Sequence, residues 1–254
     1  MFRMSTLSKE YVDLILELDE VTKACEYNDL LYGKSLADIM LYQSQVLREF
    51  FRKSSMLVFC NVARDTNEPI NVTAMNKVLK YVLDSYDEFA TLLRRELMSV
   101  EAFIPSTAED ISKTRECYRE IGLMLHPKIN DLSLSDADLA FIWAKTTDAY
   151  AKNDWKQLMF LKERAERTLR EQGIDLSELE IEVDEKEVEH LRSEVNEIKA
   201  SEDYLLGEKL RTKGWISKER ARLIKETKAT QAFVRTMDES LQEALTSGIK
   251  MVLE

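Results

Sequence analysis

The scarcity of turn-forming residues is the feature that most constrains how this chain can fold. It has 254 residues but only six glycines and three prolines, the last of them at Pro127. Average usage is about 7% glycine and 5% proline. Sandwiches, barrels and disordered tails need more turn residues than this. Charged residues make up 33% and hydrophobic residues 44%, a balance that fits helices with one buried stripe each. The chain is therefore predicted to be all-α.

Residues 1–70 are predicted to form a hairpin of two long helices. The first helix has a coiled-coil-like seam: Leu14, Leu18, Val21 and Cys25. Gly33 is expected to end this helix, because glycine readily adopts the left-handed conformation at a helix C-terminus. Ser35 and Asp38 resemble the capping box of a second helix. Two long helices joined by so short a turn would run antiparallel.

Residues 71–173 are predicted to form a central helical domain. Its first helix begins near Thr73, is stopped by Pro105, and has this apolar face: Val78, Val82, Tyr86, Phe89, Leu93, Leu97 and Val100. The next helix ends at Leu125, because His126 precedes a proline and is pushed out of the α region. Two further helices follow, over residues 135–152 and 154–172.

Residues 174–254 are predicted to form a charged helical hairpin or coiled coil. Residues 174–203 contain twelve acidic and three basic residues, whereas residues 204–235 contain nine basic and three acidic ones. Opposite charges on neighbouring segments favour folding back of one segment on the other. A second heptad seam lies in the acidic part: Val188, Leu191, Val195 and Ile198. This seam could pack within the chain or join two copies in a homodimer, and the sequence leaves both open.

The order of motifs around His126 is unusual. A helix containing Tyr118-Arg119-Glu120-Ile121 leads into His126-Pro127-Lys128-Ile129-Asn130, and the following helix ends in Asp148-Ala149-Tyr150. This order resembles the J domain of DnaJ-type co-chaperones, in which a Tyr-Arg-Lys-Leu-type helix leads into His-Pro-Asp and the next helix ends in Glu-Ala-Tyr. The resemblance implies an antiparallel helix pair with the His-Pro corner exposed at its tip. The long N-terminal helices and the charged tail with Gly214-Trp215 are also similar to bacterial J-domain-like proteins of unassigned role.

The resemblance implies a protein-binding function without chemistry of its own. J domains bind a DnaK-type chaperone through the basic helix and the His-Pro-Asp loop, and they stimulate ATP hydrolysis by that chaperone. The corresponding interaction edge in this chain comprises Lys113, Arg115, Arg119, His126, Pro127, Lys128 and Asn130. Lys128 replaces the motif aspartate, which changes an acceptor of charge −1 into a donor of charge +1. Glu120 and Met124 also thin the basic surface, so weakened stimulation of the ATPase is predicted.

The alternative is a helical scaffold or self-associating structural protein in which the J-like unit is only a fold element. The heptad seams and the divided charge favour this alternative. Either way the partner is a protein: a DnaK-type chaperone, another protein, or a second copy.

Other classes of function are disfavoured by what the sequence contains. The scattered glycines form no phosphate-binding loop and no Gly-x-Ser-x-Gly elbow, so no catalytic residue and no cofactor are expected. His190, one of two histidines, lies in an acidic helix that is interpreted as a solvated face rather than a metal site. A net charge of −11 argues against nucleic acid.

The chain is also predicted to be cytoplasmic, with no membrane segment. The uncharged stretch 54–63 is too short to span a bilayer. No apolar leader follows the start. The three cysteines are widely spaced without a Cys-x-x-Cys motif, which indicates a reducing compartment.

Overall fold

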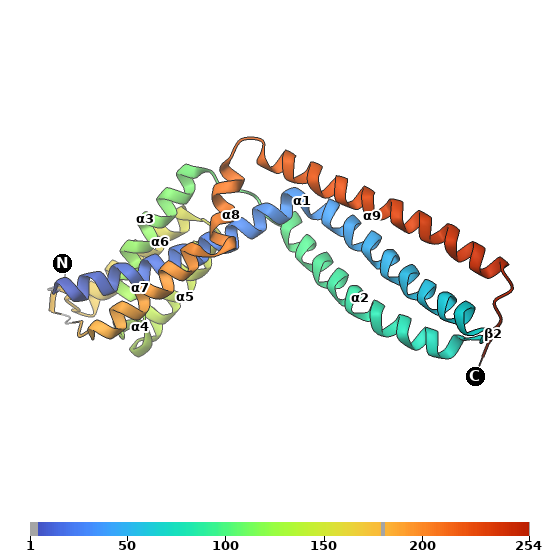
Figure 1. Cartoon of the computed structure of the whole chain (residues 1–254). Helices are drawn as coiled ribbons and strands as arrows, with labels where there is room; N and C mark the ends of the chain where they lie inside the picture. Colours follow the sequence, from blue (N-terminus) through green and yellow to red (C-terminus); the bar gives the residue numbers. More distant parts are fainter. Residues whose placement is uncertain (1–4, 179–180, 254) are drawn as a thin grey trace. The chain divides into compact units, whose positions relative to one another are not determined.

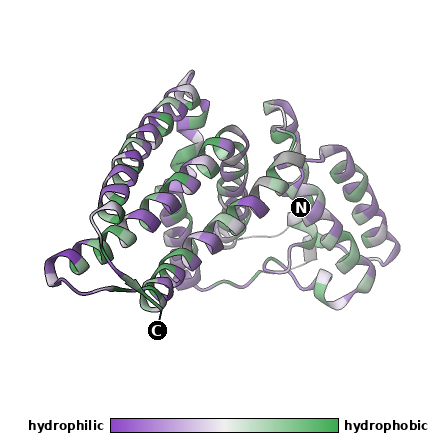
Figure 2. Cartoon of the chain, turned by 90° about the vertical axis from the view of Figure 1, so that its right-hand side faces the viewer, coloured by the Kyte–Doolittle hydropathy of each residue, from purple (hydrophilic) through white to green (hydrophobic). Residues whose placement is uncertain are grey.

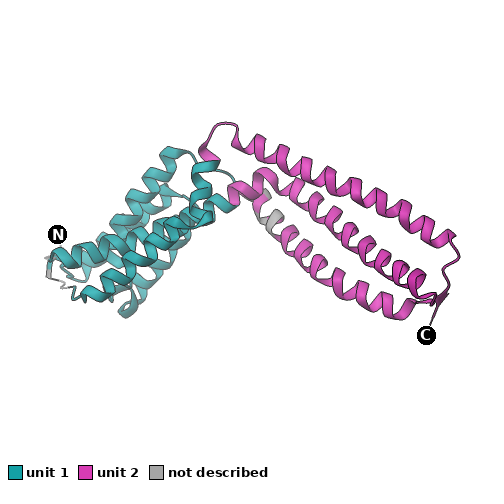
Figure 3. Ribbon diagram, in the orientation of Figure 1, with its two compact units in different colours: residues 1–29, 104–209 teal, residues 30–103, 210–254 magenta. Residues whose placement is uncertain are grey.

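The computed structural model describes residues 5–178 and 181–253, and the predicted all-α class is confirmed. Contacts divide the chain into two compact units (Figure 3): unit 1 comprises residues 1–29 and 104–209, and unit 2 comprises residues 30–103 and 210–254. This division differs from the predicted boundaries at residues 70 and 173. Polar and apolar residues alternate around the helices (Figure 2), as amphipathic packing requires. Among the described residues, no helix has the length and apolar content needed to cross a bilayer.

The predicted N-terminal hairpin is wrong, because a single helix, α1 (Thr6–Thr66), runs through the expected turn. Gly33 stays helical, and a Cβ built on it would lie 3.3 Å from Cγ2 of Val100. The Ser35 hydroxyl donates to the carbonyl oxygen of Leu31 at 2.8 Å, a helix-interior bond rather than an N-cap. Leu36 beside it is fully buried. A glycine costs a helix only about 1 kcal/mol, which packing on both sides of Gly33 outweighs.

Unit 1 is built around the N-terminal part of α1. Its other helices are α3 (Ala108–Leu125), α4 (Leu132–Ser135), α5 (Ala137–Ala151), α6 (Trp155–Glu171), α7 (Glu185–Ala200) and most of α8 (Glu202–Arg211), with a short 3₁₀ turn, η1 (Leu176–Glu178). One core joins α1, α3, α5, α6 and α7. The seam predicted on α1 faces this core rather than a second N-terminal helix, and Leu14, Leu18 and Val21 are buried in it.

Local signals set the helix ends in unit 1 close to the predicted positions. The helix before His126 ends at Leu125 as expected. Thr107 and Asp136 cap α3 and α5, because each side chain accepts a hydrogen bond from a backbone N–H in the first turn. Gly173 has a left-handed φ of 69° just after α6, the conformation that a helix-terminating glycine supplies.

Unit 2 contains three long helices. In Figure 1, the C-terminal part of α1 lies between α2 (Val72–Ala102) and α9 (Trp215–Thr246). A two-residue parallel pairing of β1 (Ile70–Asn71) with β2 (Met251–Val252) ties the start of α2 to the segment after α9. One small core surrounds Cys60, Met75 and Leu241, and another surrounds Leu36 and Leu223.

The apolar face predicted for α2 is only partly buried. Leu93 and Val100 are buried, and Val82 and Tyr86 are half-buried, whereas Val78 and Phe89 are exposed. The side chain of Leu97 lies outside the described residues. The apolar residues of α2 thus form two adjacent rows, of which one is packed.

The predicted C-terminal hairpin is also wrong, because α7 belongs to unit 1 and α9 to unit 2. Each helix pairs its charges with α1 instead. Lys199 of α7 lies 2.6 Å from Glu17, and Arg220 of α9 lies 2.6 Å from Asp38. The α7 seam is buried in the core of unit 1, so it packs within the chain and not on a second copy.

Candidate functional site

The predicted interaction edge follows α3 and the loop after it, in unit 1. α3 and α5 are antiparallel, because Tyr118 near the middle of α3 contacts Tyr150 at the end of α5, whereas His126 after α3 contacts Trp143 in the middle of α5. The expected helix pair is therefore present. Of the residues expected at its tip, however, His126 faces α1, whereas Lys128 is exposed.

The two central arginines of the edge are held by carboxylates of α1. Arg119 bridges Asp13 at 2.9 Å and Glu20 at 2.7 Å, and Arg115 lies 2.8 Å from the second oxygen of Glu20. The Glu20 side chain is only 11% exposed. Charge-assisted bonds of this kind are the strong ones in proteins, particularly when one partner is withdrawn from water. These guanidinium groups therefore serve contacts within the chain.

His126 is 6% exposed, which contradicts the expectation of an exposed corner. Its Nδ1 accepts a hydrogen bond from the backbone N–H of Lys128 at 3.1 Å, and its Nε2 lies 3.2 Å from Oδ2 of Asp19. Since Nδ1 accepts, the proton of the neutral imidazole is assigned to Nε2 and directed at Asp19. The ring edge also packs on Trp143, with 5.0 Å between the ring centroids.

Asp19 joins this histidine to a stack of aromatic rings. The Tyr118 hydroxyl donates to the same Oδ2 of Asp19 at 2.7 Å. The Tyr118 ring lies nearly parallel to that of Tyr150, with 3.7 Å between their centroids. Burial, reinforced by the carboxylate of Asp19, raises the pKa of Tyr118 well above its usual range. The Tyr118 phenol therefore keeps its proton and donates it to the carboxylate of Asp19.

A lysine of α1 closes the other end of the stack. Nζ of Lys23 lies 3.7 Å from the centroid of the Tyr150 ring and donates to Oδ1 of Asn153 at 2.6 Å. Burial lowers the pKa of Lys23 to about 8. Asn153 is itself buried, with a left-handed φ of 54° at the turn between α5 and α6.

The other predicted residues have separate roles. Lys113 pairs with Glu109 at 2.7 Å and lies over the Trp155 ring. Asn130 donates to the carbonyl oxygen of Met124 and accepts from the N–H of Leu132, so it fastens the loop. Pro127 is half-buried and Lys128 is exposed. Lys128 makes no ion pair in the part of the chain that the structure describes.

The sequence did not single out Asp19, Glu20 or Lys23. These three residues lie beside the α1 seam, and that position is the only feature of the sequence that could have pointed to a role for them. The seam showed that α1 is buried along one side but not against which helix. The contact between α1 and α3 depends on the whole core of unit 1.

The arrangement joins α1 to α3. Both imidazole nitrogens of His126 are engaged, and Oδ2 of Asp19 lies within reach of two donors, the Tyr118 hydroxyl and the His126 ring.

Comparison with known proteins gives no significant match to this chain from any family model, curated protein or solved structure. The resemblance to J domains therefore stays a prediction from the motifs, and function has to be argued from the geometry.

Proposed function

We propose that this chain is a non-enzymatic helical interaction protein in which the J-like helix pair is a fold element and not a stimulator of a DnaK-type ATPase. One observation carries the proposal. Arg119 and His126, which would have to face a chaperone, are bound instead to carboxylates of α1, Arg119 to Asp13 and His126 to Asp19. Exposing them would break charge-assisted bonds and uncover the α1 seam, which is buried in the same core.

The test is the ATPase rate of a purified DnaK-type chaperone with and without the full chain. We expect no stimulation by the natural chain and none by Lys128→Asp, because restoring the motif aspartate leaves Arg119 and His126 bound to α1. Lys145→Asp is the matched control, since Lys145 is also an exposed lysine of unit 1 and undergoes the same charge change. Stimulation by the natural chain would refute the proposal.

A second candidate is weakened chaperone coupling through the loop. The exposed position of Lys128 next to half-buried Pro127 favours it, since a partner could reach this corner without displacing α1. This candidate predicts that Lys128→Asp raises the chaperone's ATPase rate and that Lys145→Asp does not. The same assay therefore decides between the two candidates.

A cytoplasmic location is part of the proposal. Cys25, Cys60 and Cys117 are free thiols. Burial raises the pKa of all three thiols, which keeps them protonated and slow to oxidise. Thiols of this kind suit a reducing compartment.

A further inference from the structure

Helix α2 of unit 2 exposes a row of four large apolar side chains, interrupted once at Ser85. The exposed fractions are 43% for Val78, 84% for Tyr81, 54% for Phe89 and 55% for Leu92. Together with Ser85, these residues follow one another at intervals of three, four, four and three, so they share one face over about 20 Å of helix. Exposed apolar surface on this scale marks interaction sites.

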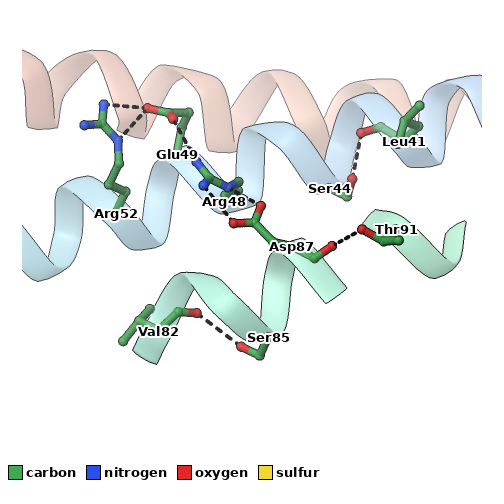
Figure 4. Close-up of polar contacts among 9 residues, drawn as sticks. All are labelled: Leu41, Ser44, Arg48, Glu49, Arg52, Val82, Ser85, Asp87 and Thr91. Atoms are coloured by element: carbon green, nitrogen blue, oxygen red, sulfur yellow. Dashed lines mark hydrogen bonds and ion pairs between the residues drawn. The ribbon is translucent and has the colours of Figure 1, made fainter. Parts of the chain in front are cut away.

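The row is distinct from the side of α2 that packs on α1. That side is held by Tyr86, whose ring stacks on Phe51 with 4.7 Å between centroids. Arg48 of α1 also reaches Asp87 with two hydrogen bonds (Figure 4), at 2.7 and 2.9 Å. The Ser85 hydroxyl, drawn in the same view, donates to the carbonyl oxygen of Val82 and so leaves no unused donor in the middle of the row.

A line of charges follows one edge of the apolar row. Lys77, Asp84, Glu88 and Arg95 lie within about 40° of one another around the helix axis, and all four are exposed. None of them makes an ion pair within the described ranges 5–178 and 181–253. Their order along the helix is positive, negative, negative, positive.

This order argues against a second copy as the antiparallel partner of α2. The apolar row is symmetric about Ser85, so an antiparallel copy would place Val78 opposite Leu92 and Tyr81 opposite Phe89. The same alignment brings like charges together along the edge, Lys77 near Arg95 and Asp84 near Glu88. Like charges across a helix interface specify against a pairing.

We propose that the row formed by Val78, Tyr81, Phe89 and Leu92 binds an amphipathic helix of another protein. That helix would carry apolar residues at heptad spacing, edged by charges in the order acidic, basic, basic, acidic. Because this order reads the same in both directions, the partner helix could run parallel or antiparallel to α2. The inference rests on the proposed interaction function and gives it a surface and a class of partner.

The test uses two synthetic helical peptides with identical apolar residues. The complementary peptide has edge charges Glu, Lys, Lys, Glu, and the reversed peptide has Lys, Glu, Glu, Lys. In anisotropy titrations with the full chain, we expect the complementary peptide to bind about tenfold more tightly, as four exposed charge pairs would give. Combining Lys77→Glu, Asp84→Lys, Glu88→Lys and Arg95→Glu should reverse the preference.

The apolar row has its own control. Tyr81→Ser with Phe89→Ser should weaken the binding of both peptides and lower the melting temperature only slightly, because Tyr81 is 84% and Phe89 54% exposed. Equal binding of the two peptides, or no binding of either, would overturn the proposal. A dimer in light scattering that these two substitutions dissolve would also overturn it, in favour of a second copy. Stimulation of a DnaK-type ATPase would instead count against the proposed function of the J-like pair alone.

Discussion

Leu16 of α1 lies so close to Gly122 of α3 that a Cβ built on the glycine would be 2.6 Å from Cδ2 of the leucine. Leu16 is 1% exposed and lies in the core of unit 1. The two helices can approach this closely only because residue 122 has no side chain. The contact helps to place the carboxylates of α1 against α3.

Gly122→Ala should therefore destabilise unit 1 by about 1–3 kcal/mol, the usual cost of overpacking a core, although alanine is the better helix former. Hydrogen exchange of the α3 amides measures this, because it reports on unit 1 by itself. In a Leu16→Ala background the same change should cost much less. An equal cost in both backgrounds would mean that the close contact is not the cause.

The hydroxyls of Tyr118 and Tyr150 form a matched pair for a second prediction. Tyr118→Phe removes a hydrogen bond to Asp19, so a loss of roughly 1–3 kcal/mol is expected for a buried bond to a charged group. Tyr150→Phe keeps the stacked rings and removes a hydroxyl that makes no hydrogen bond among the described residues, so little change is expected. Exchange rates in α3 should separate the two variants. Equal losses would mean that the hydrogen bond from Tyr118 to Asp19 contributes no more to stability than the unbonded hydroxyl of Tyr150.

The helices of this chain could be predicted better than their partners could. Pro127 and Gly173 mark helix ends through local backbone chemistry, and the structure has an end beside each of them. Gly33 carries a similar signal, but tertiary packing overrides it. Packing can outweigh the small cost of one glycine inside a helix, whereas it cannot replace the backbone N–H that a proline lacks.

Charge and periodicity were weaker guides to packing. Because α1 carries acidic residues along its length, Glu17 can pair with Lys199 of α7 and Asp38 can pair with Arg220 of α9. The charges of the C-terminal segments therefore do not specify pairing with each other. Periodicity predicted a single apolar face for α2, and that face mixes buried residues such as Leu93 with exposed ones such as Phe89. The candidate site could be anticipated on α3 and not on α1, because no local signal connects Asp19 to His126.

Lys23 gives unit 1 a dependence on pH. Its pKa is about 8 in the folded chain, below the ordinary lysine value of 10.5, so between these values the unfolded chain binds more protons. Stability then rises with pH through this window, and the penalty for burying the ammonium is fully present below pH 8. Above about pH 10 the raised pKa values of Tyr118 and Tyr150 act in the opposite direction.

Lys23→Met separates the effect of the lysine from that of the tyrosines, because Tyr118 and Tyr150 contribute alike to the natural chain and to the variant. The natural chain should gain stability relative to the variant between pH 7.5 and pH 10. Denaturant unfolding followed through the Trp143 fluorescence measures this when Trp155→Phe and Trp215→Phe are present in both proteins. Parallel stability curves over this range would show that the Lys23 ammonium is not desolvated against the Tyr150 ring.

Gly207 of α8, like Gly122, allows a close approach to α1, but its neighbour there is the polar side chain of Asn28. Asn28 is buried and its amide nitrogen donates to the carbonyl oxygen of Asp203 at 3.0 Å. A Cβ at residue 207 would lie 2.7 Å from that nitrogen and 2.8 Å from the amide oxygen. Gly207→Ala must displace the Asn28 amide and break its hydrogen bond, so a loss of stability above about 1 kcal/mol is expected.

In an Asn28→Ala background the space is already open, and the gain in helix propensity should make Gly207→Ala neutral or stabilising. Hydrogen exchange in α8 should show this reversal, and the same destabilisation in both backgrounds would mean that α8 is limited by a contact other than Asn28.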